Sequence, residues 1–392
     1  MKTTLKITGA RIFDGNRWHE EVDLVVENGR VASIGPQSVS VEASETVDAK
    51  GQLLVPGFID LQVNGGGGAL LNEQPTLEGI QRICQAHAAF GTTAMLPTLI
   101  TDTRAVTRAA IAAGVAAKAA DITGFLGLHL EGPHLSVARK GAHDPSLIRP
   151  MDADDLETLL TCMQSIGCLM VTLAPENVSE QQVRTLADAG VIVSLGHTDA
   201  SFVTACAYAE AGASCVTHLF NAMSGLGHRE PGVAGAALAV RSLNVGLIAD
   251  GFHVDPAVMQ IAMRGKQGPG RIFLVTDAMS TIGTDMTRFS LNGREILREN
   301  GRLTLADGTL AGADIDMLSC VRYVHQQLDL PLNVALRMAS AYPAEAIGLS
   351  ARKGRLTGGA EADFLLLTGD LTLRSTWING RKVFEADVSC VA

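Results

Sequence analysis

FLGLHLEGPH (125–134) is one of four stretches that decide the fold, together with VIVSLGHTDA (191–200), CVTHLFNAM (215–223) and RIFLVTDAM (271–279). Each is a short apolar run, typical of a buried strand, that stops at a group able to bind metal or move a proton. These four groups are Glu131, His197, His218 and Asp277. In a parallel β/α barrel the carboxyl ends of the strands meet on one face, so we predict that the four side chains share one site.

Working outward, strand-like runs alternate with Ala-rich helical stretches, which is typical of βα units. The eight candidate strands are LLVPGFIDLQV, TTAMLPTLI, GFLGLHLE, CLMVTLAP, GVIVSLGH, SCVTHLF, VGLIAD and IFLVTDA. They predict an α/β fold, a (β/α)8 TIM-like barrel over residues 54–354. A doubly wound open sheet is the alternative, but no GxGxxG opens a helix after the first strand.

The two ends of the chain show a different sequence pattern. Residues 4–53 show alternating apolar patches with turn signals such as Asn28-Gly29, and the tail STWINGRKVFEA carries an Asn379-Gly380 hairpin signal. We therefore predict a small β-sandwich domain formed by residues 1–53 and 355–392.

Composition limits the function classes. The chain has 47% hydrophobic and 18% charged residues, as expected of a compact globular enzyme. A net charge of −10 without Lys/Arg clusters, and only 4% aromatics, argue against a nucleic-acid partner. A small anionic substrate would need only a local cationic pocket.

The seven cysteines are odd in number and contain no CxxC, so free buried thiols in a reducing compartment are expected. The N-terminal residues lack the apolar core of a signal peptide, and no stretch reaches 18 uninterrupted apolar residues. These features predict a cytoplasmic protein with no membrane span.

Glu131, His197 and His218 match the three protein ligands of a catalytic zinc site. Any one of them alone would be read equally well as a hydrogen-bonded histidine or a buried ion pair. Their shared position at strand ends favours one divalent metal ion, zinc in the first place, with iron or another metal as alternatives. Asp277 is predicted to be the base that takes a proton from water, and a helix N-cap is its structural alternative.

Four further residues are candidates for binding. His129 points to the same side of its strand as Glu131 and is read either as a ligand or as a structural histidine. His143 is the preferred candidate for orienting a substrate carbonyl. Arg229 and His253 could form the cationic pocket for a phosphate or carboxylate. The alternative is that Arg229 is an ordinary surface arginine and that His253 caps a helix. We assign no role to His228.

Eleven segments, in this order and spacing, closely resemble N-acetylglucosamine-6-phosphate deacetylases of the amidohydrolase superfamily. They are PGFIDLQVNGGGG, PTLITD, GLHLEGPHL, KGAHDP, VTLAPE, GHTDA, THLFNAM, REPGVAGA, ADGFHVD, LVTDAM and TLAGADI, and they span nearly the whole chain. PGFID alone occurs across the superfamily, whereas the combination of HLEGP, THLFNAM and REPG indicates this one branch.

The resemblance implies a metal held by Glu131, His197 and His218, with Asp277 as the catalytic acid/base. It also implies a phosphosugar substrate and a homodimer in which a neighbouring subunit helps to hold the phosphate. The implied substrate contacts are Ala142, His143, Asn221, Ala222, Arg229, His253, Leu310, Ala311 and Gly312.

Two departures from the superfamily pattern stand out. Gln62 and Asn64 occupy the positions of the usual His-x-His, and amides are poor zinc ligands. The fourth candidate strand has no lysine to bridge two metals. We therefore expect a single metal ion. A weak second metal site at Gln62 and Asn64 is the alternative.

The expected reaction is hydrolysis of the acetamide of N-acetylglucosamine 6-phosphate. The alternatives are the galacto epimer, another amidohydrolase reaction such as deacylation of N-acyl amino acids, and a noncatalytic barrel.

Overall fold

The computed structural model describes residues 4–35, 38 and 42–387, and its centre is an eight-stranded parallel sheet. Neighbouring strands follow the chain order from β8 to β17 through β11–β16. Their bounds are β8 Phe58–Val63, β11 Thr92–Ile100, β12 Leu128–Glu131, β13 Leu169–Leu173, β14 Ile192–Leu195, β15 Cys215–Val216, β16 Asn244–Leu247 and β17 Ile272–Leu274.

The first and last strands meet at their carboxyl ends. The backbone N–H of Asp277 donates to Gln62 O at 2.9 Å, and that of Asn64 donates to Ala278 O at 2.9 Å. A parallel bridge between Val63 and Ala278 continues this contact. The sheet therefore curls into a barrel, which confirms the predicted fold class.

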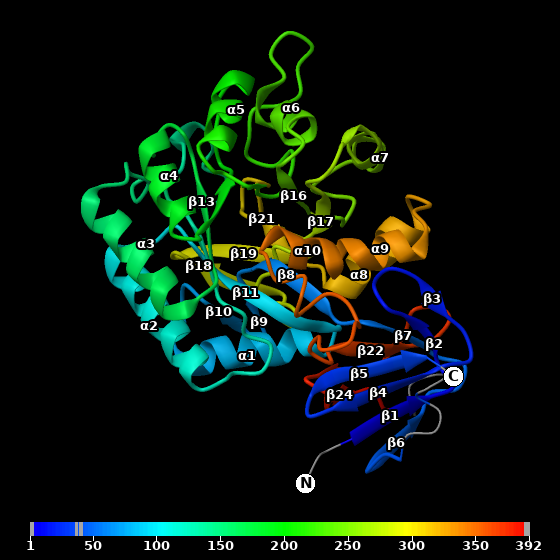
Figure 1. Cartoon of the computed structure of the whole chain (residues 1–392). Coiled ribbons are helices and arrows are strands. Elements are labelled where there is room, and N and C mark those ends of the chain that lie inside the picture. The colour runs from blue at the N-terminus through cyan, green and yellow to red at the C-terminus, as the bar shows by residue number, and fades with distance from the viewer. Residues whose placement is uncertain (1–3, 36–37, 39–41, 388–392) are drawn as a thin grey trace.

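Helices lie around the outside of the barrel (Figure 1). Side-chain caps begin most of them: Thr76 accepts from Gly79 N, and Asp152 and Ser179 form capping boxes. The bounds are α1 Leu77–Ala88, α2 Arg104–Ala119, α3 Ala153–Ile166, α4 Glu180–Asp188, α5 Phe202–Glu210, α6 Gly232–Ala239, α7 Pro256–Gly265, α8 Met317–Gln326, α9 Leu332–Met338 and α10 Ala341–Ala346.

The first candidate strand, 53–63, is two strands rather than one. β7 (Leu53–Pro56) pairs with β22 (Phe364–Leu367) in the small module, and only β8 enters the barrel. The break lies at Gly57, where a Cβ would come within 2.2 Å of Thr93 Oγ1. Only glycine allows the chain to pass this close to β11.

Strands from both chain ends build the small module, as predicted. A four-stranded sheet contains β1 (Thr4–Thr8), β4 (Asp23–Glu27), β5 (Arg30–Gly35) and β6 (Glu45–Asp48). A six-stranded sheet contains β2 (Arg11–Phe13), β3 (Trp18–His19), β7, β22, β23 (Leu373–Ile378) and β24 (Arg381–Glu385). Residues of both sheets share one apolar core, which includes Ile7, Leu24, Leu54, Phe364 and Trp377.

The tail hairpin follows the sequence signal. Asn379 and Gly380 have φ of 49° and 69° and connect β23 to β24. Positive φ at both residues is the requirement of a two-residue type I′ turn, which Asn-Gly meets at low cost.

A four-stranded antiparallel sheet between β17 and α8 was not predicted. It consists of β18 (Arg288–Leu291), β19 (Arg294–Glu299), β20 (Arg302–Thr304) and β21 (Leu310–Ala313), and we call it the inserted sheet. Its turns carry the signals Asn292-Gly293, Asn300-Gly301 and Asp307-Gly308. The short β9 (Gly65–Gly66) and β10 (Ala69–Leu70) form a separate hairpin after β8.

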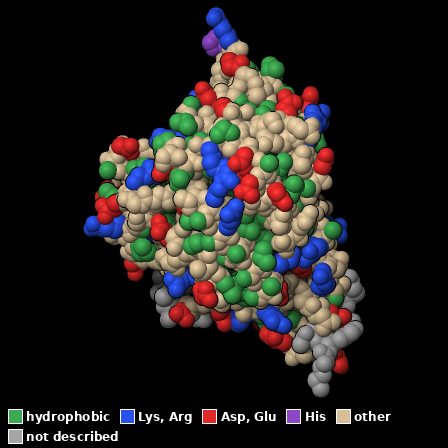
Figure 2. Space-filling view, turned by 90° about the vertical axis from the view of Figure 1, so that its left-hand side faces the viewer, with side chains coloured by type: hydrophobic (Ala, Val, Ile, Leu, Met, Phe, Trp, Pro, Cys, Tyr) green, Lys and Arg blue, Asp and Glu red, His purple; other side chains and the backbone are tan. Residues whose placement is uncertain are grey.

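A loop between β15 and α6 rises from the barrel at the top of Figure 1. Residues 225–230 of this loop are exposed, and Leu226 keeps 54% of its surface accessible. Figure 2 shows basic and histidine side chains standing clear of the molecule at this end.

Six cysteines in the described residues are free thiols, and five of them are buried, as expected. Cys390 lies outside the described residues. None of the helices within the described part of the chain has the length and apolarity needed to cross a membrane.

Candidate active site

The barrel brings the four predicted strand-end residues to one face. Glu131 is the last residue of β12, while His197 and His218 follow β14 and β15 by two positions. Asp277 follows β17 by three positions. Glu131, His197 and His218 are all at least 95% buried. The strand ends therefore bring a cluster of buried polar groups to one end of an apolar barrel.

Glu131, His197 and His218 point their donor atoms at one another. Nε2 of His197 lies 3.2 Å and Nε2 of His218 lies 3.1 Å from Glu131 Oε1, and the two nitrogens are 3.0 Å apart. Ligands about 2.0–2.1 Å from a tetrahedral zinc ion lie about 3.3 Å from one another. The triangle is thus close to the size that such an ion requires.

A backbone carbonyl fixes the tautomer of His197. Its Nδ1 lies 2.9 Å from the backbone carbonyl of Arg139, and a carbonyl can only accept a hydrogen bond. Nδ1 must therefore carry the proton, which leaves the lone pair of Nε2 facing the triangle. Nδ1 of His218 is buried without a hydrogen-bond partner among the described residues, so no hydrogen bond at this atom fixes the tautomer of the ring.

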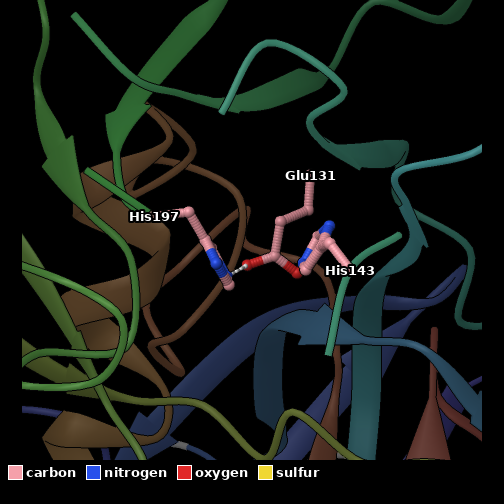
Figure 3. Close-up of side chains that lie close together, drawn as sticks. All are labelled: Glu131, His143 and His197. Atoms are coloured by element: carbon pink, nitrogen blue, oxygen red, sulfur yellow. Dashed lines mark ion pairs between the residues drawn. The ribbon is translucent and has the colours of Figure 1, made fainter. Parts of the chain in front are cut away.

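His143 lies on the other side of the Glu131 carboxylate from His197 (Figure 3). Ligand atoms of Glu131, His143 and His197 also fall within 4.8 Å of one another, so distance alone would admit His143 as a ligand. However, the backbone N–H of Thr101 donates to His143 Nδ1 at 3.3 Å, and Thr101 Oγ1 lies 2.7 Å from the same atom. Because Nδ1 accepts, the proton of the neutral ring sits on Nε2, which makes His143 a donor and His218 the better third ligand.

The electrostatics agree with these roles. Burial alone would raise the pKa of Glu131, but the close approach of His197 and His218 holds that pKa well below its usual range. Burial, together with the nearby His197, lowers the pKa of His143 well below its ordinary value. The structure therefore holds an ionised carboxylate beside a neutral His143.

Two amides hold Asp277. Asn64 Nδ2 donates to Asp277 Oδ1 at 2.6 Å, and Gln62 Nε2 donates to the same oxygen at 3.2 Å while lying 3.3 Å from Glu131 Oε1. Among the described residues only Oδ1 receives hydrogen bonds, so Oδ2 is left for chemistry. Burial, and then repulsion by Glu131, raise the pKa of Asp277 to about 6.

Three of the four strand-end residues adopt a backbone conformation that is rare outside glycine. φ is 48° at His197, 27° at His218 and 52° at Asp277. Positive φ at non-glycine residues is uncommon and, where it occurs, it concentrates at functional sites. The backbone after β14, β15 and β17 thus turns sharply where these three side chains enter the site.

Apart from Ala142 and His143, which lie in the loop after β12, the predicted substrate residues fall into two groups. Asn221 and Ala222 follow His218 in the same loop, and Asn221 Nδ2 donates to His218 O at 3.3 Å. Gly312 of β21 lies against Asp277, since a Cβ there would approach Asp277 O to 2.9 Å, and Leu310 and Ala311 are in the same strand. These residues border the triangle of Glu131, His197 and His218, or they border Asp277.

Arg229 and His253 lie in other loops. Arg229 is in the exposed loop before α6 and makes no hydrogen bond or ion pair within residues 4–35, 38 and 42–387. His228 beside it is exposed as well. His253 Nδ1 contacts Asp250 Oδ2 at 2.6 Å in the loop after β16.

Both ring nitrogens of His129 are held by neighbouring polar groups. Its Nδ1 lies 3.0 Å from Leu61 O and its Nε2 lies 2.7 Å from Thr172 Oγ1, so both ring nitrogens are occupied below the site. Burial lowers the pKa of His129 to about 4.

Sequence reasoning missed three supporting residues. Thr101 orients His143, the carbonyl of Arg139 orients His197, and buried Asp60 accepts from Thr276 Oγ1 at 2.6 Å next to Asp277. The only signal was that Thr101 and Asp60 lie on or directly after candidate barrel strands.

Comparison with known proteins agrees with this geometry. The model of the amidohydrolase family matches residues 53–383. An N-acetylgalactosamine-6-phosphate deacetylase of Shewanella sp. (strain ANA-3) is 41% identical over 97% of this chain and 96% of its own. The human N-acetylglucosamine-6-phosphate deacetylase is 36% identical over 98% of this chain and 97% of its own length.

A solved structure of the same kind of protein is also similar. N-acetylglucosamine-6-phosphate deacetylase from Pasteurella multocida superimposes with a TM-score of 0.92 at 33% identity, covering 97% of this chain and 99% of its own. The family match, the relatives and the strand-end site together place this chain in the amidohydrolase family, among the N-acetylglucosamine-6-phosphate deacetylases.

Proposed function

We propose that this protein hydrolyses the acetamide of N-acetylglucosamine 6-phosphate and releases acetate and glucosamine 6-phosphate. The observation that carries the proposal is the triangle of Glu131, His197 and His218 beside a buried carboxylate, Asp277. A carboxylate and two imidazoles with an adjacent base are the parts that metal-assisted amide hydrolysis needs.

One divalent ion, zinc in the first place and iron as the alternative, would be held by these three side chains. The donor set fits, because His197 presents a lone pair and Glu131 supplies negative charge. When bound, the metal would polarise the substrate carbonyl and make water a better nucleophile.

Asp277 would take the proton of the attacking water through Oδ2, because Oδ1 is occupied by Gln62 and Asn64. The same oxygen would then pass the proton to the leaving amine. A general acid/base works best when its pKa lies near the operating pH, and burial shifts the pKa of Asp277 in that direction.

His143 would donate from Nε2 to the oxyanion that forms on the acetyl carbonyl. The Thr101 hydrogen bonds direct this tautomer before the substrate arrives, so little reorganisation is needed during the reaction. Ala142, Asn221, Ala222 and the stretch Leu310–Gly312 would line the sugar, and His253 would help bind its phosphate.

N-acetylgalactosamine 6-phosphate is a second candidate substrate. It is favoured by the 41% identity to the Shewanella protein of that name. The two sugars differ only in the orientation of one hydroxyl group.

Acetate release from both phosphosugars, and from N-acetylglucosamine without phosphate, tests the proposed function. We expect turnover of at least one phosphosugar, its loss with a chelator, recovery on adding zinc, and little turnover of the plain sugar. A metal-loaded protein that releases no acetate from either epimer would refute the proposal, and equal turnover of the plain sugar would favour another amidohydrolase activity.

We further propose a cytosolic homodimer, in which the exposed Arg229 reaches the phosphate bound by the neighbouring subunit. Its guanidinium lacks an intrachain partner among the described residues, although an arginine fork is well suited to phosphate.

Hybrid dimers test this arrangement. Arg229→Ala and Asp277→Asn should each be nearly inactive alone, yet co-expression should restore roughly a quarter of wild-type activity, since half the dimers are hybrids with one complete site. Co-expression of Asp277→Asn with Glu131→Gln is the control and should restore nothing. Failure of the first pair to recover would show that Arg229 does not act across subunits.

A further inference from the structure

The inserted sheet (β18–β21) packs on the strand ends that carry the site. Its buried residues Phe289, Leu291, Ile296 and Leu303 form one apolar cluster with residues that include Ile100 and Met279. Ile100 directly precedes Thr101, and Met279 lies two residues after Asp277. The sheet is therefore in direct contact with two of the segments that hold site residues.

Arg294, the first residue of β19, reaches from this sheet to the loop that carries His143. Its Nη2 donates to the backbone carbonyl of Ala142, and Ala142 itself packs on the apolar cluster. The turn before Arg294 is the pair Asn292 and Gly293, with φ of 50° and 73°. This two-residue turn fixes the register in which Leu291 pairs with Arg294, so the guanidinium has a defined starting point.

The segment around His143 is thus held at two places. Thr101 holds the ring through Nδ1, while Arg294 holds the peptide that joins Ala142 to His143. Arg294 has no carboxylate within 4.0 Å among the described residues, which frees its guanidinium for this carbonyl. Loss of either contact would let the His143 ring, and with it the Nε2–H donor, move from its position beside Glu131.

The geometry points to Arg294 as a positioning residue for the reaction. It acts through Ala142 to keep the His143 donor aimed at the developing oxyanion. This inference rests on the proposed function, because it assumes the role given there to His143. A displacement of about 1 Å in such a group can cost about 100-fold in rate.

The test compares Arg294→Met and Arg294→Lys with Arg288→Met. Arg288 lies in the neighbouring strand, is 69% exposed and makes only a 3.4 Å pair with Glu295, so it controls for loss of a cation from the same sheet. We expect Arg294→Met to lower kcat about 10- to 100-fold with KM within about threefold. Arg294→Lys, which keeps a donor, should recover part of this loss, and Arg288→Met should match wild type.

Metal content, melting temperature and the ¹⁵N imidazole signals of His143 complete the test. The positioning role predicts unchanged metal and melting temperature in Arg294→Met, with altered His143 signals. A kcat within twofold of wild type, or a fall accompanied by loss of metal or of melting temperature, would overturn it.

The two proposals fail separately. Absence of wild-type acetate release would reject the proposed function, whereas the His143 signals still report whether Arg294 orders the ring. Unchanged signals in Arg294→Met would reject the positioning role even in an active enzyme.

Discussion

Asp277→Asn is expected to lower kcat by about 10²- to 10⁴-fold, the usual contribution of a positioned general acid/base. Asparagine can still accept from Asn64 and Gln62 through Oδ1, so the local geometry should survive. It cannot take a proton. Because Asp277 lies outside the ligand triangle, metal content and KM should stay close to wild type, as measured by elemental analysis and steady-state kinetics.

Asp285→Asn is the matched control for this prediction. Asp285 is exposed, belongs to the same loop after β17 and makes no hydrogen bond in the described residues. It should behave as wild type. Robust deacetylation by metal-loaded Asp277→Asn would remove Asp277 from the mechanism.

Glu131→Gln is expected to remove the metal. The side chain keeps its size but loses the charge that would balance a dication between two neutral imidazoles. Loss of a neighbour that only orients a ligand already costs about 10- to 100-fold in affinity, so loss of a ligand should cost at least about 100-fold. We expect less than about a tenth of the wild-type zinc per chain after dialysis, and activity to fall in parallel.

Glu157→Gln provides the comparison, since Glu157 is an exposed residue of α3. It should retain full metal content. If Glu131→Gln bound zinc as tightly as wild type, the three proposed ligands would not be the metal site.

Much of the barrel was predictable because its signal is local. Buried parallel strands are short apolar runs, and glycine or polar residues mark their ends, as at Glu131 and His197. The Asn379-Gly380 turn was readable for the same reason. The inserted sheet was missed because β18–β21 are short and mixed in polarity, and only the turn dipeptides between them carry a signal.

The division of residues 53–63 shows a second limit. LLVPGFIDLQV is apolar throughout because both halves are buried, but β7 is buried in the small module and β8 in the barrel. Burial leaves the same hydrophobic pattern in either sheet. The partner, β22, lies more than 300 residues away in the chain.

The sequence by itself determined the barrel class and the identity of the four strand-end groups, because strand periodicity and donor chemistry are properties of the residues themselves. Only the tertiary structure decided which ring nitrogen of His143 and of His197 carries the proton, and which carboxylate oxygen of Asp277 stays free of hydrogen bonds. Those choices depend on Thr101, the Arg139 carbonyl, Gln62 and Asn64, which approach the site from other parts of the chain. A hydrogen bond between distant segments exists only after the barrel has closed, so no local pattern encodes it.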